Sequence, residues 1–384
     1  MAQTPRTYAF DARVVHDHFP GIGRYAWNLL RELIAHLEAD ERLVVLYDPN
    51  ARSSRHPLHA LAQQASPRVA WRATPTPIFS TRNLFLAADP QWALVHYPYY
   101  VRPLALKARS ITTLYDAIPF RYPAYFPARR TRLAIRLFHW LAVLRAQRVI
   151  VLSEHARQEL AELLPAVRSK SVVILAAADP HFQPMSTAEA HATLAPRFGA
   201  LPPFCLYLAS NKPHKNLPRL VEAWRLVVNA LGAQAPLLVI AGHYDPRYPE
   251  AQQRVRALGL ESQVRFIGTV SDVEAAALYA SCELFIYPSL HEGFGLTPLE
   301  AMACGAPVAC ASASSLPEVV GEAALLFDPT DVDDIARACL VALRDPSLRA
   351  RLREASLKQA ARFSWARAAQ QTLAVYREVA EKHR

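Results

Sequence analysis

The chain has 384 residues, of which 52% are apolar and 20% charged, and its formal net charge is +10. This length exceeds one ordinary hydrophobic core and predicts two domains of typical size. We expect no membrane-spanning helix, because no window of eighteen apolar residues is free of charge. The first ten residues lack the basic, apolar and small-residue succession of a secretory signal, so none is expected.

The positive charge is concentrated in the first half of the chain. Residues 1–178 contain 23 Lys and Arg against 12 Asp and Glu, a net charge of +11, whereas the remainder has 20 against 21. This asymmetry predicts that the first half meets an anionic surface or substrate. No zinc-finger spacing, basic region or RNA-binding aromatic string is present, so we expect no nucleic acid partner.

The cysteines and histidines favour a cytoplasmic protein without a metal. The cysteines all lie in the second half and form no CxxC pair. This pattern predicts small buried side chains in a protein of a reducing compartment. The cysteines are Cys205, Cys282, Cys304, Cys310 and Cys339. His16 and His18 form a pair without a third ligand nearby, which favours a loop or acceptor contact over metal binding.

Short apolar runs alternate with amphipathic stretches along the chain. The candidate strands are residues 7–10, 42–47, 93–97, 110–115, 148–152 and 171–175, and then 204–209, 236–241, 264–268, 284–288, 307–311 and 324–327. Helix-period segments such as 23–37 and 217–231 separate them. Apolar strands separated by helices predict parallel sheets covered on both faces, hence an α/β fold of two doubly wound, Rossmann-like domains.

Domain boundaries follow from the same pattern. Residues 179–203 contain five prolines and no strand pattern, so we predict a linker there. The predicted domains are residues 1–178 and 204–364, followed by a closing segment at 365–384.

Polar loops follow several predicted strands, where ligands bind in open parallel sheets. Gly21 and Gly23 precede the first long helix, Asp116 ends a strand, and the segment 212–215 offers Lys212, His214 and Lys215 before a helix. A glycine pair before a helix also occurs as plain turn geometry, and a lysine pair as a solvated loop. Because these loops follow equivalent strand ends in both halves of the chain, we favour the interpretation that they contribute to one anion-binding site.

The segment "SLHEGFGLTPLEAMACGAPV" places two acids, Glu292 and Glu300, eight residues apart. Gly293, Gly295 and a proline prevent a continuous helix. The pattern predicts a strand, a glycine loop carrying Glu292, and a helix that starts near Thr297 with Glu300 in its first turn. Such a joint suits a phosphate, although a helix start whose acids merely complement the dipole is the alternative.

The segment 127–148 combines arginines and large apolar residues at helical spacing. Its arginines at 129, 132 and 136 accompany apolar residues at 133, 137, 140, 141 and 144. Either it is an interfacial helix, or it is a domain helix whose apolar stripe packs on the sheet. We expect the apolar stripe to pack on the sheet and the arginines to associate with an anionic membrane surface.

The block "HEGFGLTPLEAMACGAPVACASASSLPEVVGEAALLFDP" closely resembles the donor-site signature of retaining family 4 glycosyltransferases with the GT-B fold. The resemblance extends over almost the whole chain through "DARVVHDHFPGIGRYAWNLLREL", "SITTLYDAIPFRYPAYFP", "YLASNKPHKNLPRLVEAW" and "FSWARAAQQTLAVYREV". It implies an acceptor-binding domain and a nucleotide-sugar-binding domain that face each other across a cleft, with the helix at 365–384 crossing back to pack on the first domain.

The resemblance also implies roles for residues. Glu292 faces the donor sugar, Glu300 holds the ribose, Lys215 neutralises the diphosphate, and Gly21 approaches it from the other domain. The implied donor site comprises Gly21, Ser210, Lys212, Lys215, Glu292, Gly293, Phe294, Gly295, Leu296, Thr297 and Glu300. The implied catalytic residues are Glu292, Lys215 and Asp116, and the implied acceptor contacts are His16, Arg24 and Tyr115.

The chemistry of glycosyl transfer accounts for these residue types. Negative charge develops on the departing phosphate, and a lysine with helix-end N–H groups can stabilise it without a metal or cofactor. We find no DxD triplet of the kind that metal-dependent transferases carry. Two positions depart from the family pattern: Ala209 to Lys212 replaces an expected glycine and arginine, and Tyr115 replaces a histidine before Asp116.

The resemblance predicts an enzyme that transfers a hexose, in the first place mannose from GDP-mannose, with retention of configuration. The acceptor is a hydroxyl of a glycan or a lipid-linked molecule, and the enzyme is cytoplasmic with a peripheral position at the inner membrane face. UDP- and dTDP-sugars remain alternatives for the donor. The alternative functions are a nucleotide-sugar-binding protein without turnover and a phosphorylase or epimerase of the same fold.

Overall fold

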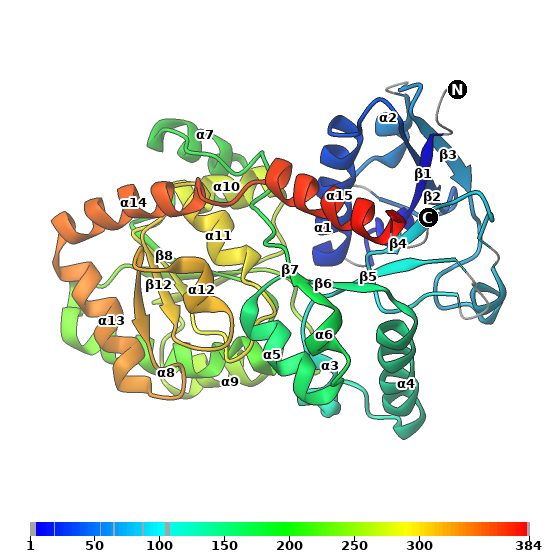
Figure 1. Ribbon diagram of the computed structural model, residues 1–384. Helices are drawn as coiled ribbons and strands as arrows, with labels where there is room; N and C mark the ends of the chain where they lie inside the picture. Colours follow the sequence, from blue (N-terminus) through cyan, green and yellow to red (C-terminus); the bar gives the residue numbers. More distant parts are fainter. Residues whose placement is uncertain are drawn as a thin grey trace. The chain divides into compact units, whose positions relative to one another are not determined.

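The computed structural model describes residues 5–18, 20–53, 55–63, 66–86, 88–103 and 108–381. The chain forms two compact units, one of residues 1–176 with 364–384 and the other of residues 177–363. Each unit is an open parallel sheet with helices packed against it (Figure 1). Within the described residues, no helix combines the length and apolar character needed to cross a bilayer.

The sheet of the first unit has seven parallel strands in the order β3-β2-β1-β4-β5-β6-β7. The strands are β1 Arg6–Asp11, β2 Glu41–Tyr47, β3 Val69–Ala73, β4 Leu94–Tyr97, β5 Ser110–Leu114, β6 Arg148–Val151 and β7 Ser171–Val173. The α-helices are α1 Pro20–Ala35, α2 Leu58–Gln63, α3 Ile118–Arg121, α4 Arg129–Arg145, α5 Glu154–Leu163, α6 Val167–Lys170 and α15 Trp365–Glu381, and the 3-10 turns are η1 Ala12–Val14, η2 Thr81–Phe85 and η3 Pro123–Tyr125.

The second unit has a sheet of six parallel strands in the order β10-β9-β8-β11-β12-β13. The strands are β8 Phe204–Leu208, β9 Leu237–Ala241, β10 Val264–Gly268, β11 Leu284–Tyr287, β12 Val308–Ala311 and β13 Ala324–Phe327. The helices are α7 Thr187–Phe198, α8 Leu217–Leu231, α9 Glu250–Ala257, α10 Asp272–Ser281, α11 Leu296–Ala303, α12 Leu316–Val320, α13 Val332–Arg344 and α14 Pro346–Ala360, with 3-10 turns η4 Pro213–Lys215 and η5 Gly232–Gln234.

The prediction of two doubly wound, Rossmann-like sheets is therefore confirmed. In both units the chain starts in the middle of the sheet, builds outward to one edge, and then returns to build the other half. This order creates a switch point between β1 and β4 in the first unit and between β8 and β11 in the second. The apolar pattern missed β3, which lies at the sheet edge and has no buried residue.

The predicted linker at 179–203 instead contains α7 and belongs to the second unit. Ser186 and Glu189 form a capping box that starts this helix despite the surrounding prolines. Ala190 and Leu194 are buried in the core of the second unit, and α7 packs against α10. Burial of an amphipathic face thus outweighs the proline signal.

The apolar stripe of α4 does not pack on the sheet, contrary to our expectation. The side of α4 that faces the protein consists of Ile135, His139, Ala142 and Val143. Leu133, Leu137, Trp140 and Leu144 are instead about half exposed. The helix has apolar residues on two sides, and the side with Ile135, Ala142 and Val143 is the buried one.

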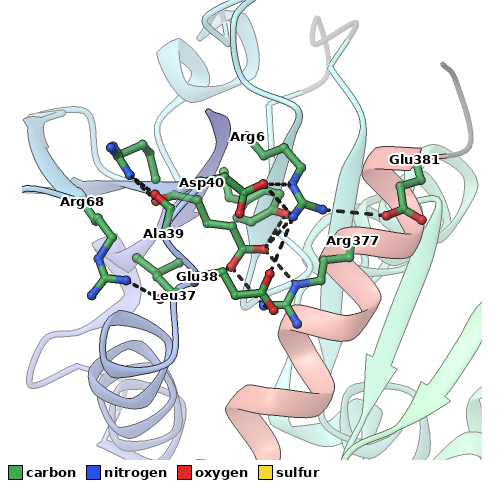
Figure 2. A network of polar contacts seen from close by, with 11 residues as sticks. Arg6, Leu37, Glu38, Ala39, Asp40, Arg68, Arg377 and Glu381 are labelled. Carbon is green, nitrogen blue, oxygen red and sulfur yellow. Dashed lines mark hydrogen bonds and ion pairs between the residues drawn. The ribbon is translucent and has the colours of Figure 1, made fainter. Parts of the chain in front are cut away.

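The closing helix α15 belongs to the first unit and packs against α1. Figure 2 shows the polar network around its last turns, where Arg377 and Glu381 meet Arg6 and the segment before β2. Arg377 Nε and Nη2 donate to the two carboxylate oxygens of Glu41 over 2.9 and 3.0 Å. Glu41 also accepts from Tyr8 Oη over 3.0 Å and is fully buried. A buried acid is therefore neutralised by the helix.

Two further contacts fix α15. Tyr376 Oη lies 2.7 Å from His96 Nδ1, and His96 Nε2 lies 2.8 Å from Thr113 Oγ1. Burial lowers the pKa of His96 to about 3, so this chain of hydrogen bonds contains a neutral imidazole. At the end of the helix, Arg109 donates to the carbonyl oxygens of Val379 and Ala380 over 3.0 and 2.8 Å, which caps the C-terminal carbonyls.

We expect Arg377→Ala to lower the free energy of unfolding by about 2 to 4 kcal/mol, because it removes the hydrogen-bonded charge partner of the buried Glu41 carboxylate and leaves only Arg6, whose Nη2 is 3.9 Å from Glu41 Oε1. Urea unfolding monitored by far-UV circular dichroism measures this loss. Gln371→Ala, at an exposed position of the same helix, is the matched control and should change the midpoint little. Equal midpoints for both variants would show that the ion pair is dispensable.

Candidate functional site

The candidate site of the second unit forms around its switch point. β8 and β11 are neighbours in the sheet, so the loops that leave their carboxyl ends lie side by side. Leu290 N donates to the carbonyl oxygen of His214 over 2.7 Å, and Ser289 Oγ lies 3.2 Å from the same oxygen. The loop that carries Lys215 and the glycine loop that carries Glu292 are therefore held together by two contacts to the His214 carbonyl oxygen, one from the main chain and one from a side chain.

Lys215 and Glu292, which are 77 residues apart in the sequence, form a hydrogen-bonded ion pair. Lys215 Nζ lies 2.6 Å from Glu292 Oε1 and 2.8 Å from Tyr287 Oη, and Tyr287 Oη donates to the same carboxylate oxygen over 2.8 Å. The two charged side chains are only 15% and 12% exposed. The structure thus brings together the two residues that were predicted to be catalytic in this unit.

Electrostatics keep this ion pair charged. Burial by itself raises the pKa of Glu292, but the charge of Lys215 together with hydrogen bonds from Lys215 and Ser289 holds that pKa below its ordinary value. Burial and the carboxylate of Glu292 raise the pKa of Tyr287 well above its ordinary value, so its hydroxyl stays protonated. Burial, together with the Lys215 charge, lowers the pKa of His214 to about 3, which leaves that imidazole neutral. Lys215 is therefore the positive group of this cluster.

The glycine loop is held by the serines that follow β12. Glu292 N donates to Ser314 Oγ over 2.8 Å, and Ser315 Oγ lies 2.9 and 2.7 Å from the carbonyl oxygens of Glu292 and Phe294. Gly295 has φ +117°, and a Cβ there would lie 3.0 Å from Leu316 Cδ2. This position needs glycine for its backbone conformation, and a Cβ there would also require the Leu316 side chain to shift.

Helix α11 begins at Leu296, with Thr297 in its first turn, close to the predicted start. Glu300 is the fifth residue of the helix, so it lies just beyond the first turn in which it was expected. It is buried, as are the neighbouring residues from Pro298 to Met302. Phe294 is also buried and packs edge to face against Phe363, with the ring centroids 5.9 Å apart.

The remaining predicted donor residues lie between β8 and α8. The carbonyl oxygen of Ser210 accepts from Tyr207 Oη over 2.8 Å, and that of Lys212 accepts from Lys215 N over 2.9 Å. The Lys212 side chain is exposed. Asn211, between them, accepts from Asp245 N over 2.7 Å and so ties this loop to the one after β9.

A largely apolar cavity of about 200 Å³ adjoins this loop. Its walls come from the carboxyl ends of β8, β9 and β10, and include Ala209, Gly242 and Phe266. At Gly242, φ is +128° and a Cβ would lie 2.1 Å from the carbonyl oxygen of Ala209. The sequence analysis did not identify this cavity, because no motif marks the glycine after β9.

The predicted site residues of the first unit lie after β1 and β5. Gly21 lies within the first turn of α1 and not in a loop before it, and a Cβ there would meet nothing within 4 Å. Gly23 is the more constrained position, with a Cβ 3.3 Å from the carbonyl oxygen of Val14. Arg24 follows on the same helix and is buried.

The other predicted residues of this unit have local structural partners. His16 Nδ1 accepts from His18 N over 3.2 Å, and burial together with His18 lowers the pKa of His16. Tyr115 Oη donates to the carbonyl oxygen of Pro98 over 2.8 Å, and its ring meets Tyr25 of α1 edge to face. Asp116 Oδ1 accepts from Ile118 N over 2.8 Å and so shapes the start of α3.

Sequence reasoning missed three residues of the donor-side cluster, Tyr287, Ser314 and Ser315. Tyr287 is the last residue of β11, and its position five residues before Glu292 was the available signal. The two serines follow β12, which is the neighbour of β11 in the sheet. The sequence does not show that these two strands are adjacent.

Two family models match the chain. The model described as Glycosyltransferase Family 4 matches residues 19–182, and the model described as Glycosyl transferases group 1 matches residues 197–359. The O-antigen chain mannosyltransferase B of Escherichia coli is 31% identical over 93% of this chain and 96% of its own length. The serotype-specific mannosyltransferase WbdA of Escherichia coli is 37% identical over 59% of this chain and 28% of its own length.

Among solved structures, sucrose-phosphate synthase from Thermosynechococcus elongatus superposes with a TM-score of 0.71 at 21% identity, over 97% of this chain and 99% of that one. The two parallel sheets and this likeness define the class of protein as a glycosyltransferase fold of the GT-B type. With matching models over both halves and a relative aligned over nearly its full length, the chain belongs to glycosyltransferase family 4.

We expect Gly242→Ala to destabilise the second unit by about 1 to 3 kcal/mol more than Gly259→Ala, because its Cβ meets the Ala209 carbonyl oxygen. Gly259 is a matched control, since it also has a positive φ (+62°) but open space around the Cβ position. Thermal melting of both variants measures the difference. Equal melting temperatures would mean that the β8 and β9 ends move apart freely.

Proposed function

We propose that this glycosyltransferase moves a mannosyl residue from GDP-mannose to a hydroxyl of a glycan or a lipid-linked acceptor, with retention of configuration and without a metal. The observation that carries the proposal is the 2.6 Å ion pair between Lys215 and Glu292 at the switch point of the second sheet. The choice of mannose rests on the similarity to the two Escherichia coli mannosyltransferases.

In this proposal Lys215 stabilises the departing diphosphate. An ammonium has three N–H donors, and Glu292 and Tyr287 accept two of them, so the third can serve a phosphate oxygen. As the glycosidic bond breaks, negative charge grows on the diphosphate and positive charge on the sugar ring. The ammonium of Lys215 can stabilise the negative charge on the diphosphate, and the carboxylate of Glu292 can stabilise the positive charge on the sugar ring. Because hydrogen bonds already hold both groups in place, neither has to reorient during the reaction.

Glu300 has a different task. It lies on α11 just past the helix start, where a carboxylate can accept hydrogen bonds from two adjacent ribose hydroxyls. In the first unit we propose Asp116 as the third catalytic residue. We propose that the acceptor is contacted by His16, Arg24 and Tyr115. A cytoplasmic location at the inner face of a membrane fits a lipid-linked acceptor.

A panel of nucleotide sugars tests the proposed activity. GDP-mannose should release GDP only when an acceptor is present, and UDP-glucose and dTDP-sugars should react more slowly. Release of GDP that no acceptor accelerates would contradict transfer. Binding without any release would favour the alternative of a nucleotide-sugar-binding protein without turnover, which the two departures from the family pattern motivate.

The two glutamates should have separable effects. Glu300→Ala should raise the KM for the donor by roughly tenfold to several hundredfold with a smaller effect on kcat, because ribose binding is shared by ground and transition states. Glu292→Gln should mainly lower kcat.

Calorimetry with the nucleoside diphosphate separates the two roles further. The diphosphate should bind Glu292→Gln about as well as the parent, because Lys215 keeps its charge, and should bind Glu300→Ala weakly. Glu322→Gln, at an exposed position of the same unit, is the control. Equal losses of affinity in both site variants would contradict this division of tasks.

We expect turnover to survive EDTA with little change, because Lys215 and the start of α11 supply positive charge at the diphosphate. The measurement is the initial rate before and after chelation, with and without added Mg²⁺ or Mn²⁺. Loss of activity on chelation and recovery with either ion would refute the proposed metal independence.

A further inference from the structure

The outer side of α4 carries a continuous apolar stripe. Leu133, Leu137, Trp140 and Leu144 follow one another in steps of four, three and four residues, which places them on one side of the helix. Their exposed fractions are 57, 52, 52 and 49%. Single exposed apolar residues are common on protein surfaces, but four in one row mark a surface that another body covers.

Positive charge borders this stripe. At 100° per residue, Arg130 and Arg136 lie on opposite flanks of the stripe, and Arg129 continues it at the start of the helix. All three are exposed, as is Arg145 at the other end. The helix contains five arginines and no acidic residue, so the apolar row lies within a purely cationic rim.

The position of α4 leaves this side accessible within its unit. Figure 1 shows α4 at the periphery of the first unit, where the short α3 packs against it and Lys170 of α6 donates to the carbonyl oxygens of Val143 and Leu144 at its end. Its inner side packs on β5. Because Ile135, His139, Ala142 and Val143 already anchor the helix, the outer row is not needed to hold the helix in place.

The charge pattern selects the occupant. A second copy of the chain docked through this row would bring two sets of arginines together without any acid on α4 to neutralise them. A bilayer with anionic headgroups supplies an apolar interior for the leucines and phosphates for the arginines. The long arginine side chains can extend to the headgroups while the apolar row is inserted below them. We propose that α4 lies flat in the interface of an anionic membrane, with Leu133, Leu137, Trp140 and Leu144 inserted below the headgroups.

This proposal goes beyond sugar transfer, and its test needs no activity. The full chain is sedimented with vesicles of phosphatidylglycerol and phosphatidylcholine at three to seven, and with phosphatidylcholine alone. We expect binding to the anionic vesicles that weakens several-fold at high salt but persists, because insertion adds to the electrostatic attraction. Absence of binding, or binding that ignores both salt and lipid charge, would overturn the proposal.

Two sets of variants separate the arginines from the apolar row. Replacing Arg129, Arg130 and Arg136 by Gln should weaken partitioning about a hundredfold. The control replaces the exposed arginines 52, 82 and 168 of the same unit by Gln and should have a much smaller effect. Equal effects would mean that net charge, and not α4, governs binding.

The double variant Leu137→Ser with Trp140→Ser should reduce partitioning about tenfold or more while leaving the melting temperature unchanged. Val273→Ser with Val341→Ser, which changes two exposed apolar residues of the second unit, is the matched control and should bind like the parent. If light scattering instead showed a dimer that only the α4 double variant abolishes, the row would be an interface between copies and the membrane proposal would fail.

Tryptophan fluorescence reports the depth of insertion. Binding to anionic vesicles should shift the emission to the blue, and lipids brominated near the headgroup should quench it. Trp140→Phe should remove both effects while the protein still sediments with the vesicles. If the shift and quenching persisted in Trp140→Phe, another surface would be the inserted one.

Discussion

The buried ion pair of Lys215 and Glu292 is the constraint around which the second unit is organised. Removing two charges from water is costly, and the pair offsets this cost only if both side chains are held in contact and fully hydrogen-bonded. Tyr287 accepts a hydrogen bond from Lys215 and donates one to Glu292, and Ser314 and Ser315 fix the main chain of the glycine loop. The central placement of β8 next to β11 is what allows these loops to meet.

The first unit uses the same principle for a structural purpose. Glu41 is fully buried at the start of β2, and its charge is neutralised by Arg377, 336 residues later in the chain. The last helix is thereby joined to the sheet by a specific polar contact in addition to apolar packing. The neutral His96 between Tyr376 and Thr113 adds a second such link. Both contacts specify one docking position for α15, which apolar packing by itself defines less sharply.

Helix α4 contrasts with these well-paired interiors. Its inner side buries Ile135, His139, Ala142 and Val143, whereas a row of three leucines and one tryptophan faces outward within a rim of arginines. In a helix that served only the fold, burial of the large side chains would give the greater stabilisation. This outward row of large apolar side chains is the observation behind our proposal that a membrane surface supplies their burial. If the proposed membrane contact of α4 holds, the acceptor of this glycosyltransferase would be presented at a bilayer.

The amino-acid sequence by itself determined the class of fold and most of the strands, because buried parallel strands are apolar on both faces and stand out locally. It also marked the glycine loop with Glu292 and the helix that carries Glu300, since both belong to one short segment. Only the tertiary structure decided that Lys215 and Tyr287 share one oxygen of Glu292, because strand order brings distant loops together. It also decided that residues 187–198 form a helix in the core and that α4 presents its large apolar residues outward. A helix with apolar residues on two sides carries no local signal for which side will be buried, because packing against the sheet makes that choice.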